Sequence, residues 1–261
     1  MLRAFSTAAT GMQAQQMMVD VIANNLANVN TTGFKRSQID FQDLLYVTQQ
    51  ESGTEVTAGI ISPSGLEVGS GVRPASTVKV FTSGEFQNTG RQLDIAIRGD
   101  GFLQVLMPSG ETWYTRDGSL QINAFGQLVT TTGYPILPSI SVPTDAVAVN
   151  IGADGGVNVT DSSGSRSVVG TIQLARFPNP SGLASKGDNL LAESEASGTA
   201  ITGNAGENGI GTIQSAFLEK SNVQMVTELV NLITAQRAYE VNSRAIKAGD
   251  DMLQTTNSIV T

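Results

Sequence analysis

The sequence predicts an α+β protein in which long N- and C-terminal helices form a coiled-coil-like inner domain, with a central all-β domain between them in the chain. Three observations predict this fold. Apolar residues recur at every seventh position near the C-terminus, a matching spacing occurs near the N-terminus, and apolar and polar residues alternate in the middle. A seven-residue period is typical of helices that pack along a seam, and a period of two is typical of half-buried strands.

The C-terminal helix is predicted within residues 216–261. Its first seam position holds Leu218, Met225, Leu232, Tyr239, Ile246, Leu253 and Val260. Its second seam position is mostly amide or hydroxyl and holds Asn222, Leu229, Gln236, Ser243, Asp250 and Asn257. One side of the seam is therefore expected to be apolar and the other side wet. Arg237 is expected to pair with Glu240.

The N-terminal helix is predicted from about residue 2 to about residue 28, with Gly33 as a positive-φ residue at its exit. One seam position holds Phe5, Met12, Val19 and Leu26, and the other holds Ala8, Gln15, Ile22 and Val29. The segment after the seam is rich in asparagine, namely Asn24, Asn25, Asn28 and Asn30. Because asparagine is only a middling helix former, we expect this surplus to hydrogen-bond a neighbouring segment.

Two interpretations of the terminal helices are open. They could close one globular domain as a pair, or they could be assembly elements shared between copies of the chain. About 45 residues at roughly 1.5 Å each make a rod about 68 Å long. Since a single compact β-domain cannot cover that length, and isolated helices are stabilised by burying a face, the second interpretation is favoured.

The middle of the chain divides into three parts. Residues 37–75 are predicted as an extended arm, punctuated by glycine and proline but too apolar for a free linker. Its apolar residues are Phe41, Leu44, Leu45, Tyr46, Ile60, Ile61, Leu66 and Val68. Residues 76–180 alternate with period two between Asp-Gly turns, which predicts a β-sandwich or open barrel. Residues 181–215 are polar and are predicted as a loosely held return connection.

Composition excludes several classes of function. The chain of 261 residues has no cysteine and no histidine, which excludes disulfides, a Ser-His-Asp triad, a Cys-His pair and a His-bearing zinc site. The net charge of the whole chain is −8, and the charges of residues 37–215 alone sum to −9. Nucleic acid is therefore not an expected ligand. We expect no membrane insertion and no cleaved signal peptide, because long apolar runs are missing.

Three acidic residues of the β-region are candidates for a catalytic carboxylate pair. Asp94, Asp100 and Asp117 lie near strand ends, but two of them precede glycine and are better explained as turns. The segment 152–161 lacks the spacing of a calcium loop. Adjacent Trp113 and Tyr114 should point to opposite faces of a strand, one of them into the core. The sequence therefore predicts no catalytic residue, no metal and no cofactor.

Two long motifs resemble those of the bacterial flagellar axial proteins, the rod and hook family. The N-terminal motif is ANNLANVNTTGFKR, residues 23–36, and the C-terminal motif is SNVQMVTELVNLITAQRAYEVNSRAIKAGDDML, residues 221–253. Together they cover about a third of the chain, in the family's order. Within the family, the arm and the short length are most similar to the distal rod members.

The resemblance implies a structural subunit that polymerises helically into a hollow, rigid shaft of the flagellar basal body. It implies contacts with copies of itself, other rod subunits, the hook protein, the P- and L-ring proteins and the flagellar type III export apparatus. The location would be the periplasm to outer-membrane region. The expected assembly interface comprises Phe5, Met12, Val19, Ile22, Asn24, Asn25, Leu26, Asn28, Leu218, Met225, Leu229, Leu232, Gln236, Arg237, Tyr239, Ile246 and Leu253, and the expected arm contacts are Phe41, Leu44, Tyr46, Ile60, Ile61 and Leu66.

Two alternatives remain at this stage. The chain could be a proximal rod or hook protein of the same family. More distantly, it could be a secreted β-sandwich enzyme or a sugar-binding module with helical tails.

Overall fold

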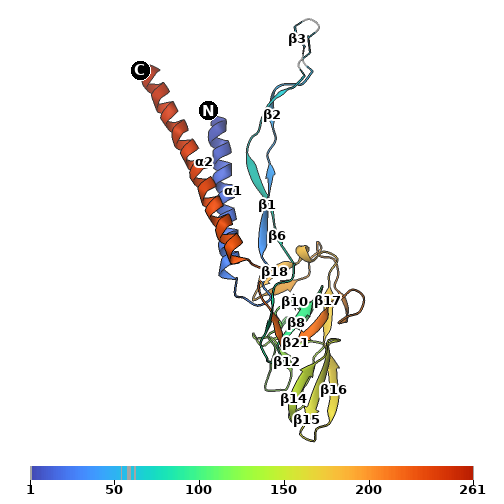
Figure 1. The fold of residues 1–261 in the computed structure, drawn as a ribbon. Helices are drawn as coiled ribbons and strands as arrows, with labels where there is room; N and C mark the ends of the chain where they lie inside the picture. Colours follow the sequence, from blue (N-terminus) through green and yellow to red (C-terminus); the bar gives the residue numbers. More distant parts are fainter. Residues whose placement is uncertain (1, 54, 58–59, 62, 261) are drawn as a thin grey trace. The chain divides into compact units, whose positions relative to one another are not determined.

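The structure is a computed structural model that describes residues 2–53, 55–57, 60–61 and 63–260 (Figure 1). The chain forms two compact units. The first unit contains Met1–Leu26, Ser37–Val78 and Met225–Thr261, and the second contains Ala27–Arg36 and Lys79–Gln224. The helices and the arm thus belong to one unit, and the β-rich body belongs to the other.

The first unit contains two long helices, α1 (Leu2–Ala27) and α2 (Met225–Val260). They run antiparallel, so that both chain ends lie at the same end of the pair (Figure 1). Close contacts fix this direction: a Cβ built on Gly249 would lie 2.8 Å from Cζ of Phe5, and one built on Gly11 would lie 2.9 Å from Nδ2 of Asn242. The predicted pair of terminal helices is confirmed, and small residues let its backbones approach closely.

The predicted start of the C-terminal helix is wrong. Leu218 belongs to strand β22 (Phe217–Glu219), which pairs antiparallel with β7 (Phe86–Asn88). The helix begins only at Met225. Leu218 fits the seven-residue period, but the chain there is held as a strand by its pairing with β7, and periodicity alone does not report that pairing.

The arm is a hairpin rather than a single extended segment. Strand β1 (Ser37–Asp43) pairs with β6 (Val72–Lys79), β2 (Val47–Gln50) with β5 (Leu66–Val68), and β3 (Glu55–Thr57) with β4 (Ile60–Ile61). The β2–β5 register sets Val47 opposite Val68. The side chains of Ile60 and Ile61, two predicted arm contacts, lie outside the described residues.

The body is β-rich, as predicted. Its largest sheet has seven strands in the order β18-β19-β10-β9-β17-β20, with β13 also on β9. These strands are β9 (Phe102–Leu106), β10 (Thr112–Thr115), β13 (Ile136–Leu137), β17 (Gln173–Arg176), β18 (Ala184–Gly187), β19 (Leu190–Ala192) and β20 (Ile201–Asn204). Tyr114 of β10 is buried and Trp113 is half-buried, so the core member of that predicted pair is the tyrosine.

Smaller sheets complete the body. A three-stranded sheet joins β14 (Ala146–Ile151), β15 (Gly156–Asp161) and β16 (Arg166–Thr171). Two-stranded pairs join β8 (Ile95–Arg98) to β21 (Thr212–Ser215) and β11 (Gln121–Ile122) to β12 (Leu128–Val129). The main core contains Ile95, Ile97, Leu103, Leu120, Leu128, Ile136, Ile172 and Leu174.

The predicted loose return connection at residues 181–215 is wrong. The segment contains the short 3-10 helix Pro180–Gly182 at its start and strands β18, β19, β20 and β21. Leu190 and Leu191 of β19 are buried and pair with β10. The strands of this segment were not predicted from its polar, glycine-rich composition, because only a few of its side chains enter the core.

Candidate assembly faces and the Glu219 junction

The side of α2 that the first unit covers is built from small and polar residues. Glu228, Ala235, Asn242 and Gly249 stand seven apart; Glu228 and Ala235 are buried, and Asn242 and Gly249 lie against α1. A seven-residue spacing keeps these positions on one face of the helix. The inner seam of α2 is therefore not the predicted apolar series.

The opposite face of α2 is apolar and exposed. Val226 is 75% exposed, and Val230 and Ile233 are each 56% exposed. At 3.6 residues per turn, these three share one face, and Ala235 lies on the far side of the helix. Leu229 borders the same face and is also exposed. A group of exposed apolar side chains on one face is a candidate interaction surface. We call Val226, Leu229, Val230 and Ile233 the outer α2 face.

The predicted seam residues of α2 take different positions. Leu232 and Ile246 are half-buried, whereas Met225, Tyr239 and Leu253 are exposed at 38% or more. Gln236 and Arg237 are exposed, and Gln236 and Tyr239 line a groove beside Val19 of α1. Glu240, the predicted partner of Arg237, lies 4.0 Å from Arg244, one helical turn further on.

On α1, the predicted seam residues are at least half covered: Phe5, Met12, Val19 and Leu26 are half-buried, and Ile22 is buried. Asn25 is 1% exposed. Its Nδ2 donates to the Ser37 carbonyl and its Oδ1 accepts from the Ser37 amide, both at 2.8 Å. The expected hydrogen bond to a neighbouring segment is thus confirmed for Asn25, but that side chain is used within the chain. Asn24 is exposed and Asn28 half-buried.

The arm exposes apolar side chains along its length. Leu45 is 89% exposed, and Tyr46, Leu66 and Val68 are also exposed. Phe41 and Leu44 are half-buried, and the Leu44 amide donates to the Gly71 carbonyl. A Cβ on Gly71 would lie within contact of Thr10 Oγ1 on α1, so only glycine fits where the arm meets the helix.

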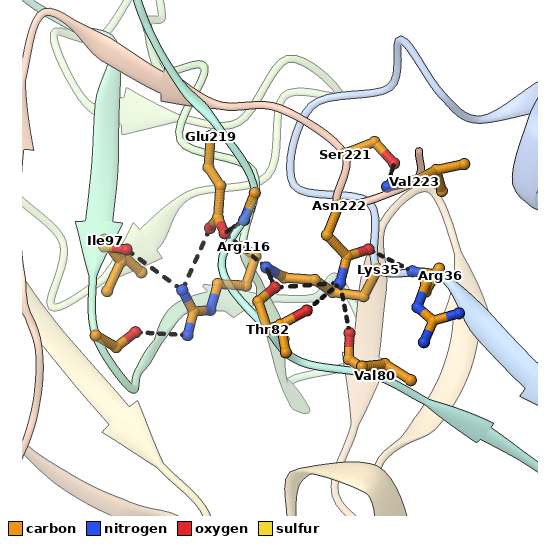
Figure 2. Close-up of polar contacts among 12 residues, drawn as sticks. Lys35, Arg36, Val80, Thr82, Ile97, Arg116, Glu219, Ser221, Asn222 and Val223 are labelled. Carbon is orange, nitrogen blue, oxygen red and sulfur yellow. Dashed lines mark hydrogen bonds and ion pairs between the residues drawn. The ribbon is translucent and has the colours of Figure 1, made fainter. Parts of the chain in front are cut away.

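In the second unit, a buried carboxylate joins segments from both ends of the sequence. Glu219 of β22 accepts from Lys35 Nζ at 2.6 Å and from Arg116 Nη1 at 3.2 Å (Figure 2). It also accepts from the Gly84 amide at 2.9 Å. All three charged side chains are almost fully buried, so one carboxylate is shared by two cations in a region of low dielectric.

Each cation has further oxygen partners. Lys35 Nζ donates to the Thr82 carbonyl at 2.8 Å, and Arg116 donates to the carbonyls of Ile97 and Gly99. Burial lowers the pKa of Lys35 below its ordinary value, and attraction to Glu219 offsets part of that effect. Arg116 lies over the ring of Phe102, with its Cζ 5.4 Å from the centroid. Lys35, Glu219 and the two Nη atoms of Arg116 are thus hydrogen-bonded, whereas Arg116 Nε is buried without a hydrogen-bond partner among the described residues.

The loop after α1 docks beside this cluster. The Thr32 hydroxyl donates to Asp117 Oδ1 at 2.9 Å, and the Gly33 amide donates to the Glu219 carbonyl at 2.8 Å. Gly33 has φ +67°, as predicted for the helix exit. A Cβ there would lie 2.7 Å from the backbone of Arg116 and Asp117, so glycine is required for both conformation and space.

Asn222 holds three segments with one amide (Figure 2). Its Oδ1 accepts from the Arg36 amide at 2.8 Å. Its Nδ2 donates to the Val80 carbonyl at 2.8 Å and faces the Thr82 carbonyl at 3.1 Å and the Thr82 hydroxyl at 3.0 Å. We call Lys35, Arg36, Val80, Thr82, Arg116, Glu219 and Asn222 the junction.

Sequence reasoning missed the junction. Asn222 was assigned to the second seam of the C-terminal helix, and Glu219 and Arg116 received no role. The available signal was charge: Lys35 lies in the N-terminal motif, and Glu219 lies two residues before the C-terminal motif. Spatial proximity across more than 180 residues cannot be derived from periodicity.

Comparison with known proteins agrees with this geometry. Three family patterns match: "Flagella basal body rod protein" at residues 5–35, "Flagellar hook protein FlgE/F/G D1 domain" at residues 96–159, and "Flagellar basal body rod FlgEFG protein C-terminal" at residues 214–259. The flagellar basal-body rod protein FlgG of Buchnera aphidicola is 47% identical over 251 residues, which cover 96% of each chain. FlgG proteins of Borreliella burgdorferi and Caulobacter vibrioides are 45% and 46% identical, over 99% of each chain.

The chain belongs to the flagellar basal-body rod protein family. It is a structural subunit of the distal rod, as the arm and the short length predicted within the family. The N-terminal rod pattern ends at Lys35, and the C-terminal pattern includes Glu219 and Asn222. The two terminal family segments of this rod protein therefore meet at the junction, within the second unit. Among the described residues, neither helix has a stretch apolar enough to cross a lipid bilayer.

Proposed function

We propose that this rod subunit polymerises helically into a rigid, hollow drive shaft, and that the outer α2 face packs against a neighbouring copy. The observation that carries the proposal is the exposure of Val226, Val230 and Ile233 on the side of α2 away from Ala235. Water contact with these side chains is costly, and burying one fully gains about 1.5–3 kcal/mol. A second copy covers this surface in the polymer.

Membership of the rod family favours an open polymer over a closed dimer. The inner seam of α2, with Ala235 and Gly249, is already used against the same chain, so the outer face is the side of α2 that can meet a second copy. Contacts between different surfaces of successive copies repeat into helical filaments when they do not close. The exposed seam residues Tyr239 and Leu253 extend the contact.

The arm is proposed to stiffen the polymer by bridging copies. Its exposed apolar residues, Leu45, Tyr46 and Leu66, are too many for a free surface hairpin. Packed on an adjacent subunit, they oppose sliding of one copy past the next.

Other partners follow from membership of the rod family. We propose that the rod subunit contacts other rod subunits, the hook protein and the P- and L-ring proteins, and that it passes through the flagellar type III export apparatus without cleavage of a signal peptide. Its place would be the periplasm to outer-membrane region. Torque would pass along the shaft to the hook, and exported subunits would pass through its channel.

A catalytic role is not part of the proposal. Asp117 accepts hydrogen bonds from Thr32 and Ser119, and buried Asp94 lies 3.5 Å from Arg91. These contacts support structural roles for the carboxylates that could have formed an active site.

The test is the double variant Val230→Ser/Ile233→Ser. Losing about 2 kcal/mol of apolar burial per contact should raise the critical concentration for polymerisation about thirtyfold. Sedimentation and electron microscopy measure this, and the fluorescence of the single tryptophan, Trp113, checks that the body is folded. The matched control is Val147→Ser/Val168→Ser, which removes two exposed apolar side chains from the body.

The control should polymerise like the unchanged chain. If both double variants polymerise at the same concentration as the unchanged chain, the outer α2 face is not an assembly surface.

A further inference from the structure

The junction lies where the chain passes between its two units. The chain crosses from one unit to the other after Leu26, Arg36, Val78 and Gln224. Three of these crossings lie within two residues of Arg36, Val80 and Asn222, all of which belong to the second unit. Any force carried along the chain between helices and body must pass through these crossings.

One side chain connects the three crossings. Asn222 Oδ1 accepts from the Arg36 amide, and Asn222 Nδ2 donates to the Val80 carbonyl. The Arg36 carbonyl in turn accepts from the Val80 amide at 3.0 Å, which closes a ring of hydrogen bonds. The three segments are therefore joined directly to one another, and not only through the rest of the body.

The buried charges of Lys35 and Glu219 are also bonded to the segments of this ring. The Thr82 carbonyl receives both Asn222 Nδ2 and Lys35 Nζ, and Lys35 reaches Glu219, three residues before Asn222. Each segment of the ring thus has a second attachment to Glu219, because the Gly84 amide also donates to that carboxylate. Charge-assisted hydrogen bonds of this kind are shorter and stronger than neutral ones.

The chemistry requires an asparagine at this position. One planar group must accept a hydrogen bond from the Arg36 N–H and donate to the Val80 and Thr82 carbonyls. A primary amide does both. A carboxylate of the same shape would present an oxygen to the Val80 and Thr82 carbonyls.

We propose that Asn222 is a positioning residue that locks the three crossings into one node, so that they carry torque together instead of sliding or opening one at a time. The torque part of this inference rests on the proposed function, whereas the locking of the node can be measured on the free subunit. Asn222 acts through Arg36 and Val80, and it contacts no neighbouring copy in this role.

The test compares Asn222→Asp with Asn88→Asp in the full chain. Asn88 is exposed, and its Oδ1 accepts from the Gly90 amide, an interaction that aspartate keeps. Residue-resolved hydrogen exchange is measured at the amides of Arg36 and Val80 and, as a core reference, at Ile172, which donates to the Gly155 carbonyl. Asn222→Asp should speed exchange at Arg36 and Val80 at least about tenfold and leave Ile172 unchanged, because local opening is separate from global unfolding.

Two results overturn the node. In the first, Asn222→Asp leaves the exchange rates at Arg36 and Val80 as they are in Asn88→Asp. In the second, the exchange rate at Ile172 rises as much as the rates at Arg36 and Val80, which would show a general loss of stability. If Asn222→Asp does not fold, Thr82→Val decides: it removes one hydroxyl partner of the amide with little change of shape, and it should speed exchange at Val80 by a smaller factor. No change in Thr82→Val then counts against the node.

The mechanical part is tested in basal bodies isolated from cells that carry each variant. With equal numbers of basal bodies per cell, Asn222→Asp should increase the fraction that are broken within the rod, relative to Asn88→Asp. If Asn222→Asp speeds hydrogen exchange but does not increase the fraction of broken rods, the torque role is refuted. The locking of the three crossings by Asn222 is still supported in that case. If the unchanged chain itself forms no rod, the proposed function fails, and the exchange result still stands.

Discussion

At the residue scale, the junction is unusual because one buried carboxylate serves two buried cations. Taking charges out of water is costly, and the attraction repays that cost only where geometry and hydrogen bonding are good. Glu219 meets both conditions, with Lys35 at 2.6 Å, Arg116 at 3.2 Å and the Gly84 amide at 2.9 Å. The cluster therefore specifies how the segment after α1 and the segment before α2 meet, rather than adding much net stability.

Removing the carboxylate charge should destabilise the body strongly. Glu219→Gln leaves Lys35 and Arg116 buried without a counter-charge, and breaking a buried pair in this way costs about 3 kcal/mol or more. Urea unfolding followed by Trp113 fluorescence measures the loss. The exposed substitution Arg166→Gln serves as the control and should change the free energy of unfolding by less than about 0.5 kcal/mol.

A second substitution separates charge from shape. Adding Lys35→Met to Glu219→Gln removes one unpaired cation, so the double variant should lose less than the sum of the two single losses. Additive losses would show that Lys35 and Glu219 do not stabilise the body as a pair.

At the element scale, periodicity predicted what is local and missed what is not. The seven-residue spacing identified both helices, and the period of two identified the β-rich body. The inner seam was not predicted because it uses Gly11, Ala235 and Gly249. These small residues let the two helices approach closely, and they do not form a pattern of large apolar side chains. Leu218 was placed in the helix because its spacing fits, although strand pairing with β7 holds it.

The arm hairpin could be predicted only in part. Its apolar residues predicted that the arm packs on another surface. They did not predict the pairing of Val47 with Val68, because these positions are 21 residues apart and a short-range pattern does not relate them. The junction was missed for the same reason, since Arg36, Val80 and Asn222 meet only in the folded chain. What is fixed by neighbours in sequence was predictable, and what is fixed by distant hydrogen bonds was not.

The arm gives the prediction at this scale. Deleting residues 50–62 removes the end of the hairpin while Val47 and Val68 can still pair. The polymer should form but bend more easily, because the deletion removes Ile60 and Ile61, two of the expected arm contacts. Persistence length from electron micrographs measures this, with Phe125→Ser as a control that removes an exposed apolar side chain from the body. An unchanged persistence length in the deletion would refute the stiffening role.

At the scale of the whole molecule, stability is distributed unevenly between the two units. The body has a buried core, which includes Leu103, Leu120 and Leu174, and a cluster of buried ion pairs. The helix pair buries small side chains on its inner seam and leaves Val226, Val230 and Ile233 in water. Since helices gain most of their stability from burying a face, α1 and α2 should be marginal in the free subunit and stable in the polymer.

This difference predicts where order is gained on assembly. In the free subunit, amides of α1 and α2 should exchange with solvent much faster than core amides such as Leu103 and Leu174, and in the polymer they should become protected. Core amides should exchange at the same rate in both states, which makes them the internal control. Val230→Ser/Ile233→Ser should keep the helix amides unprotected at concentrations where the unchanged chain polymerises. Helix amides that are as protected as the core in the dilute subunit would mean that the helix pair is already complete, and that the outer α2 face has no part in stabilising it.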